Sequence, residues 1–125
     1  MKVTFEWNGH PLEVDTEDRV MIFDDHGRKT ALMYMPGLND LVMIPVDREG
    51  WKWNGNTAAP TFSPSILTRA TQGREQHKVR NHVFVRNGVV QYLSDCTHEL
   101  VRKSIELPRL GEWPQEFKYW SDDQQ

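Results

Sequence analysis

The sequence has little cysteine, no long apolar run and no basic excess. Its 125 residues include one cysteine, Cys96, which excludes an intramolecular disulfide framework and suits a reducing compartment such as the cytoplasm. No run of about 18 apolar residues and no signal-peptide core is present, so we expect no membrane association. Fifteen Lys and Arg against 18 Asp and Glu give a net charge of −3, which argues against nucleic-acid binding. These absences favour one soluble cytoplasmic domain.

The residue patterns predict a mainly β fold. Polar and apolar residues alternate in Lys2–Trp7, as in a half-buried strand. Asn87 and Gly88 separate two apolar runs and predict a hairpin with a type I′ turn. We expect an exposed loop over the polar residues Thr68–Arg80 and one short helix over His98–Lys103. The sum is a β-rich α+β domain, a small antiparallel sandwich or rolled sheet of short strands.

Two groups of side chains are candidates for binding a partner. Aromatic residues anchor many protein interfaces, and several lie near the C-terminal end of this chain. The polar segment before the hairpin also carries basic residues that suit an anionic surface. The partner-binding candidates are therefore Trp113, Phe117, Tyr119, Trp120, Arg74, Lys78 and Arg80.

One group of side chains suggests chemistry. His82 opens one arm of the hairpin, and Cys96 and His98 follow the other arm, so the three could converge. Three such ligands plus water would form an open zinc site. Alternatively, Cys96 could be a nucleophile with His82 or His98 as its base and Asp95 as the orienting acid. A buried structural cysteine beside two ordinary histidines is the third interpretation, and no HExxH, CxxC or phosphate-binding glycine loop is present.

Four blocks of the chain resemble a known family. They are Gly50–Asn56, Pro60–Leu67, His82–Gly88 and Gln91–Leu100. The family is a small domain of unknown function, widespread in tailed bacteriophages and prophages, whose members often carry the label ammonia monooxygenase. Nothing in this sequence resembles a membrane copper enzyme. The resemblance implies a single domain: unmatched strands over about residues 1–31, a core over 32–110, and an aromatic tail with a frayed end over 111–125.

The chain departs from this family at residues that look like zinc ligands in typical members. These members carry a Cys-Pro-x-Cys element, a following histidine, and a cysteine directly before His82 of this sequence. The corresponding positions here are Met35, Leu38, Val42 and Asn81. The resemblance therefore implies that the zinc site is lost, that apolar side chains fill its space, and that His82, Cys96 and His98 are a hydrogen-bonded or packed remnant.

The sequence thus predicts a bacteriophage accessory protein that binds another protein without catalysis. The partner would be a host or defence factor or a virion component. No cofactor is expected, and a homo-oligomer remains open because an exposed edge strand could pair with its twin. Two alternatives are a hydrolase that depends on Cys and His or on a metal, and a nucleic-acid-binding module that uses the basic segment.

Overall fold

The structure is a computed structural model, and it describes residues 1–7 and 9–118. The mainly β fold is confirmed, with two single-turn 3-10 helices, η1 (Leu110–Glu112) and η2 (Gln115–Phe117). The strands, in chain order, are β1 (Lys2–Trp7), β2 (His10–Asp15), β3 (Met21–Asp25), β4 (Arg28–Met35), β5 (Asp40–Pro45), β6 (Lys52–Trp53), β7 (Phe62–Ser63), β8 (Ile66–Gln72), β9 (His77–Arg86), β10 (Val89–Tyr92) and β11 (Ser104–Glu106).

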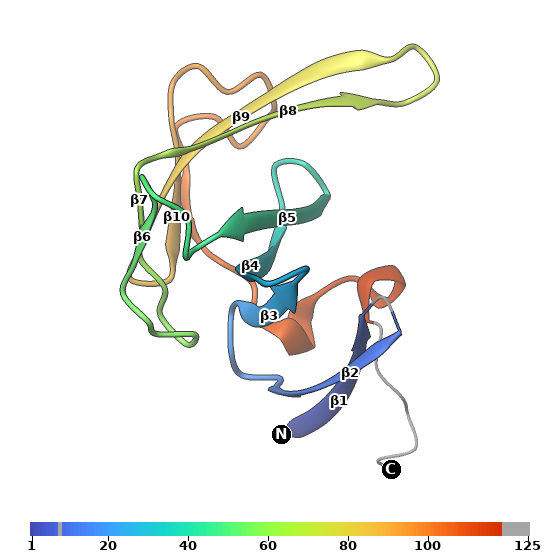
Figure 1. The fold of residues 1–125 in the computed structure, drawn as a ribbon. Coiled ribbons are helices and arrows are strands. Elements are labelled where there is room, and N and C mark those ends of the chain that lie inside the picture. The colour runs from blue at the N-terminus through green and yellow to red at the C-terminus, as the bar shows by residue number, and fades with distance from the viewer. Residues whose placement is uncertain (8, 119–125) are drawn as a thin grey trace.

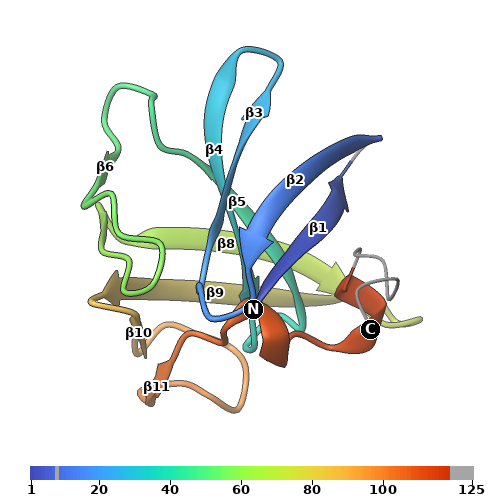
Figure 2. The ribbon, with the colours of Figure 1, turned by 90° about the horizontal axis from the view of Figure 1, so that it is seen from below.

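The middle sheet has order β3-β4-β5 and is covered on both faces (Figures 1 and 2). Its central strand β4 shows why. Ala31, Met33 and Met35 are buried in one core cluster with residues of β9 and β10. Leu32 and Tyr34, which point to the opposite face, are buried in a second cluster with residues of β1 and the C-terminal turns. The four-stranded sheet β11-β10-β9-β8 therefore covers one face, and the β1–β2 hairpin covers the other.

The turn between β9 and β10 has the predicted geometry. Asn87 and Gly88 have φ angles of 49° and 78°, and two consecutive positive values define a type I′ turn. The strands pair with Val89 opposite Arg86 and Val90 opposite Val85. This hairpin fixes where His82 lies, because His82 belongs to β9.

The prediction of an exposed loop over residues 68–80 is wrong. Strands β8 and β9 pair antiparallel from Ile66 opposite Val83 to Gln72 opposite His77. The arm is polar because much of it faces solvent, but its backbone groups still satisfy one another across the pair. The face turned inward carries few apolar residues, Ala70 and Val79 among them, so the segment shows little of the apolar alternation that marks a half-buried strand and its composition resembled a loop.

The prediction of a short helix over residues 98–103 is also wrong. Turns replace it, with the Val101 amide donating to the His98 carbonyl at 3.2 Å and the Lys103 amide to the Leu100 carbonyl at 3.0 Å. Arg102 has a φ of 65°, which a right-handed helix does not allow. Within the described ranges no helix is long and apolar enough to cross a membrane.

Candidate active site

A serine, a histidine and an aspartate form a hydrogen-bonded row at the edge of the four-stranded sheet. The Ser65 Oγ lies 2.8 Å from the His82 Nε2. The His82 Nδ1 lies 3.1 and 3.0 Å from the two carboxylate oxygens of Asp95. Asp95 thus orients the imidazole through Nδ1, and the other ring nitrogen, Nε2, contacts the Ser65 hydroxyl, as in the Ser–His–Asp triad of serine hydrolases.

Local backbone structure brings Ser65 to His82. The chain leaves β7 through a cis peptide bond between Ser63 and Pro64, and Ser65 directly precedes β8. Leu67 of β8 lies opposite His82 of β9. Because side chains alternate along a strand, Ser65 and Leu67 point to the same face as His82. Ser65 is therefore a diagonal cross-strand neighbour of His82, within reach of its ring.

The segment that follows β10 holds Asp95 against β9. The Leu93 amide donates to the His82 carbonyl at 2.9 Å, and the Thr97 amide donates to the Arg80 carbonyl at 3.0 Å. In return, the Thr97 hydroxyl accepts the Arg80 amide at 2.8 Å. These bonds on both sides of Asp95 fix its backbone, so the carboxylate is directed at the ring of His82.

The thiol of Cys96 contacts the backbone of His82 and not its ring. The Cys96 Sγ accepts the His82 amide at 3.3 Å and donates to the His82 carbonyl at 3.2 Å. The side chain is 8% exposed. Both ring nitrogens of His82 are taken by Ser65 and Asp95. Cys96 is therefore placed as a positioning residue for His82, and the imidazole is aimed at Ser65.

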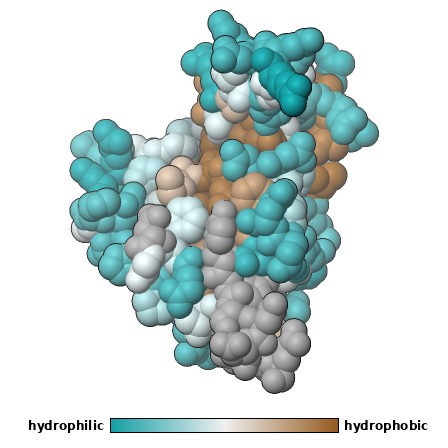
Figure 3. Space-filling view, turned by 90° about the vertical axis from the view of Figure 1, so that its right-hand side faces the viewer, coloured by the Kyte–Doolittle hydropathy of each residue, from teal (hydrophilic) through white to brown (hydrophobic). Residues whose placement is uncertain are grey.

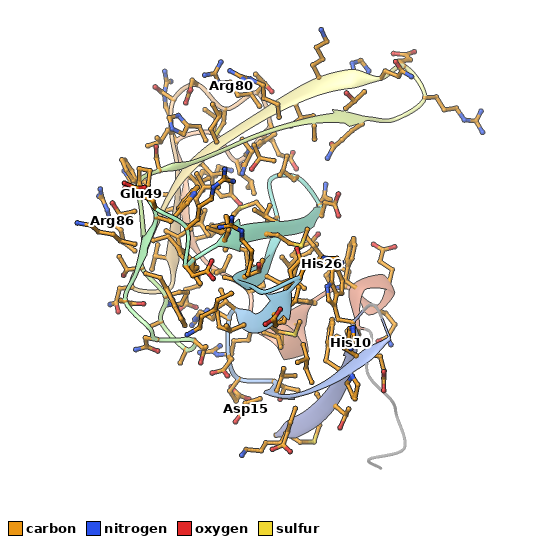
Figure 4. All side chains as sticks on the ribbon, viewed as in Figure 1. His10, Asp15, His26, Glu49, Arg80 and Arg86 are labelled. Carbon is orange, nitrogen blue, oxygen red and sulfur yellow. The ribbon has the colours of Figure 1, made fainter. Side chains whose placement is uncertain are left out.

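The charge around Asp95 favours its ionised form. Partial burial raises the pKa of Asp95, but hydrogen bonds from His82 and its own backbone amide, together with the charges of His82 and Arg80, outweigh burial and lower the pKa below 3.8. The Arg80 Nε lies 3.1 Å from an Asp95 oxygen, as an ion pair without a directed hydrogen bond. An ionised Asp95 accepts the Nδ1 proton of His82, which leaves Nε2 to accept the Ser65 proton. His10 on β2 and His26 in the β3–β4 turn lie well away from Arg80, which pairs with Asp95 (Figure 4).

The three candidate ligands, His82, Cys96 and His98, do not gather around one point. His98 Nε2 lies 2.8 Å from the amide oxygen of Asn81, and its Nδ1 accepts the Leu100 amide at 3.2 Å. Asn81 and His82 are neighbours on β9, so their side chains point to opposite faces of the sheet. Burial lowers the pKa of His98 below 6.5, which favours the neutral ring. In the described part of the chain, no group of three or more His, Cys, Asp and Glu side chains could hold a metal ion.

The positions where relatives were expected to carry zinc ligands form packed core. Met35, Leu38 and Val42 are buried in the same cluster as Cys96. Tyr92 lies beside them, and its hydroxyl accepts the Gly37 amide at 3.0 Å and contacts the Met35 sulfur at 3.5 Å. A Cβ at Gly37 would lie 2.5 Å from the His98 ring, so only glycine fits this contact. The expectation that the protein needs no zinc stays a prediction.

The structure places the partner-binding candidates in different environments. Trp113 is 2% exposed and packs edge-on against Phe5, with ring centroids 6.2 Å apart. Its ring is therefore core and not a surface anchor. Phe117 is half-buried against Tyr34. The Tyr119 and Trp120 predictions lie outside the described residues. Of the basic candidates, Arg74 and Lys78 are exposed, and Arg80 pairs with Asp95.

An open groove lies beside Ser65. It has a volume of about 540 Å³ and runs between β5 and β8. Met43 and Leu67, both of which line it, are 53% and 42% exposed. Each of these strands is at the edge of its sheet, so each presents unpaired backbone groups. Hydrophobic surface is visible directly below the polar tip of the β8–β9 hairpin (Figure 3). An extended chain can therefore approach the hydroxyl of Ser65 along this groove.

Sequence reasoning selected His82 and Asp95 but missed Ser65. Ser65 lies 17 residues before His82, in a Pro-Ser segment without the Gly-x-Ser-x-Gly pattern of the nucleophile elbow. The chain order Ser, His, Asp also gives no local signature, because such triads are recognised by geometry. The available signal was the pairing of β8 with β9, which puts a serine beside the histidine.

The site geometry is that of a serine hydrolase on a small β scaffold. A family model described as "Bacterial ubiquitination-like system serine protease (BubE)" matches residues 6–93. The chain belongs to this family. The matched segment contains Ser65 and His82 and ends two residues before Asp95. No curated protein and no solved structure matches this chain.

The family match corrects the functional prediction. A bacteriophage protein was expected from the family resemblance. It was expected to bind a partner and not to be an enzyme, because zinc-ligand positions are altered, no catalytic constellation was recognised and aromatic residues are abundant. The family is instead named for a serine protease, which points to catalysis. Nothing in the match supports a bacteriophage assignment or the monooxygenase label. The altered positions are buried: Met35, Leu38 and Val42 pack in one core cluster, and Asn81 faces the core from β9. None of their side chains hydrogen-bonds to Ser65, His82 or Asp95, so their alteration does not argue against catalysis.

Proposed function

We propose that this chain hydrolyses peptide bonds by nucleophilic catalysis at Ser65. The observation that carries the proposal is the continuous hydrogen-bonded row from the Ser65 hydroxyl through His82 to Asp95. The description of the family, a serine protease, supports it independently.

The roles follow from the geometry. The Ser65 oxygen attacks the carbonyl carbon of the substrate while His82 Nε2 takes the hydroxyl proton. His82 then gives this proton to the departing amine, and the acyl group stays on Ser65. A water molecule attacks the acyl group, again losing a proton to His82, and Ser65 recovers its proton as the acid product leaves. Asp95 stays ionised throughout and stabilises the transient imidazolium.

The substrate that suits this site is a polypeptide in extended form. The groove beside Ser65 is open and apolar, and edge strands border it. The family description suggests that the substrate belongs to a bacterial ubiquitination-like system, and such a protein is the partner that we propose. A cytoplasmic location remains part of the proposal, supported by the unpaired Cys96. A homo-oligomer stays a prediction.

Replacing Cys96 with Ser separates a serine nucleophile from a cysteine nucleophile. A hydroxyl at this position can keep both contacts with the His82 backbone, so peptide turnover should stay within about tenfold of wild type. We expect treatment with iodoacetamide to leave wild-type turnover unchanged as well. Cleavage of a mixed peptide library, followed by mass spectrometry, measures both effects.

The opposite pattern would contradict the proposal. Turnover that survives Ser65→Ala but disappears in Cys96→Ser or after alkylation would make Cys96 the nucleophile. A library that the wild-type protein leaves uncleaved, under conditions where a reference serine protease cleaves it, would count against proteolysis.

A further inference from the structure

The β8–β9 hairpin places three cations on the same face as the triad. Arg69 lies directly opposite Arg80. The adjacent pairs on this face are Leu67 with His82, towards Ser65, and Thr71 with Lys78, towards the hairpin turn. We call Arg69, Lys78 and Arg80 the basic cluster. It continues the triad face along the hairpin.

Repulsion within the basic cluster lowers the stability of the folded hairpin. Like charges directly opposite each other on paired strands are destabilising, and Asp95 neutralises Arg80 alone. Within residues 1–7 and 9–118, Arg69 and Lys78 form no ion pair with a carboxylate. These cations gather in one place although the protein has a net charge of −3. The folded chain gains no ion pair from Arg69 or Lys78 within the described residues, whereas an anionic ligand would pair with them.

A pocket connects the three cations. It has a volume of about 450 Å³, and no carboxylate lines it. Besides the basic cluster, its lining includes the hydroxyl-bearing Thr71 and Thr97, which can donate hydrogen bonds. The pocket therefore suits a carboxylate.

The spacing along β8 relates this pocket to the reacting bond. Arg69 follows Ser65 by four residues, which corresponds to about 13 Å in a strand. Because β8 is an edge strand, an extended substrate can lie along it and present alternate side chains to this face. We propose that the basic cluster binds an acidic side chain of the polypeptide substrate, about three to five residues from the bond that Ser65 attacks. This inference rests on the proposed function and names a substrate class for it.

Binding of peptide pools to the Ser65→Ala protein tests the proposal without turnover. The pools are random except for one fixed position, which carries Glu, Gln or Lys, and bound peptides are identified by mass spectrometry. We expect about tenfold more retention of the Glu pool than of the Lys pool, and a smaller ratio at high salt. Adding Arg69→Glu and Lys78→Glu should reverse the preference. Arg74→Glu is the matched control, because Arg74 lies in the hairpin turn and outside the pocket, and it should keep the preference.

Several results would overturn the inference. Equal retention of the Glu and Lys pools would do so, as would a preference that the double charge reversal leaves unchanged. Binding of a single-stranded oligonucleotide that the double reversal abolishes, with no peptide preference, would make the cluster a nucleic-acid site. If the double reversal does not fold, Arg69→Gln with Lys78→Gln replaces it, and the Glu preference should disappear.

The proposed function is tested separately in the same proteins. A small fluorophosphonate probe reports the triad alone, so Arg69→Glu with Lys78→Glu should react with it as wild type does. Normal labelling without a Glu preference refutes the acidic subsite only. A Glu preference without labelling of wild type refutes catalysis at Ser65 only.

Discussion

Replacing Ser65 with Ala is expected to lower kcat for peptide hydrolysis by about a thousandfold to a millionfold. The substitution removes the oxygen that His82 Nε2 contacts at 2.8 Å, and no other hydroxyl of the described residues hydrogen-bonds that ring. Because Ser65 is half-buried, the free energy of unfolding should change by no more than about 1 kcal/mol. Turnover of a cleaved library peptide and the denaturant midpoint measure the two effects.

Ser63→Ala is the matched control for this prediction. Ser63 precedes the same cis-proline and is exposed, but it is not part of the hydrogen-bonded row. Turnover of Ser63→Ala should equal that of wild type. The account is wrong about the nucleophile if Ser63→Ala loses turnover while Ser65→Ala keeps it.

Replacing Asp95 with Asn is expected to lower kcat by about ten thousandfold, the loss that removing the charge of the orienting acid causes in a Ser–His–Asp triad. The amide keeps the size of the side chain but removes the negative charge that holds the Nδ1 proton on His82. His82 can then present a protonated Nε2 to Ser65, and this tautomer cannot accept the hydroxyl proton. Steady-state kinetics should show the loss mainly in kcat, because Asp95 does not line the substrate groove.

Arg80→Gln provides the comparison for Asp95→Asn. Arg80 Nε contacts the same Asp95 oxygen, Oδ2, as His82 Nδ1, in an ion pair that is partly exposed. Such pairs contribute little in water, so Arg80→Gln should reduce kcat by no more than about tenfold. A loss in Arg80→Gln as large as that in Asp95→Asn would mean that the ion pair, and not the orientation of His82, controls the reaction.

Turn residues made part of this fold predictable. Asn87 with Gly88 required a tight hairpin, and the apolar runs on either side supplied its strands. The β8–β9 arm was not predictable in the same way, because few apolar residues mark its inner face and the pairing of its strands depends on long-range register. The short helix failed for a local reason: the ring of His98 accepts the Leu100 amide, and this contact competes with helical hydrogen bonding.

The sequence predicted two of the three residues of the candidate active site. Asp95 and His82 flank a hairpin that sequence rules identify, so their proximity followed from the turn. Ser65 depended on the pairing of β8 with β9, which composition did not reveal. The functional prediction failed because strand β9 carries a core residue on one face and a residue of the candidate active site on the other. Asn81 faces the core, and its neighbour His82 faces Ser65. Altered residues on the core face were interpreted as lost function, although the other face carries an intact triad.

The most direct test of the central claim is the residue that a fluorophosphonate probe modifies in the wild-type protein. Peptide mapping by mass spectrometry should locate the adduct on Ser65, and His82→Ala should abolish the labelling, because the hydroxyl then has no base to accept its proton. An adduct on another residue, or labelling of Ser65 that does not depend on His82, would contradict the account.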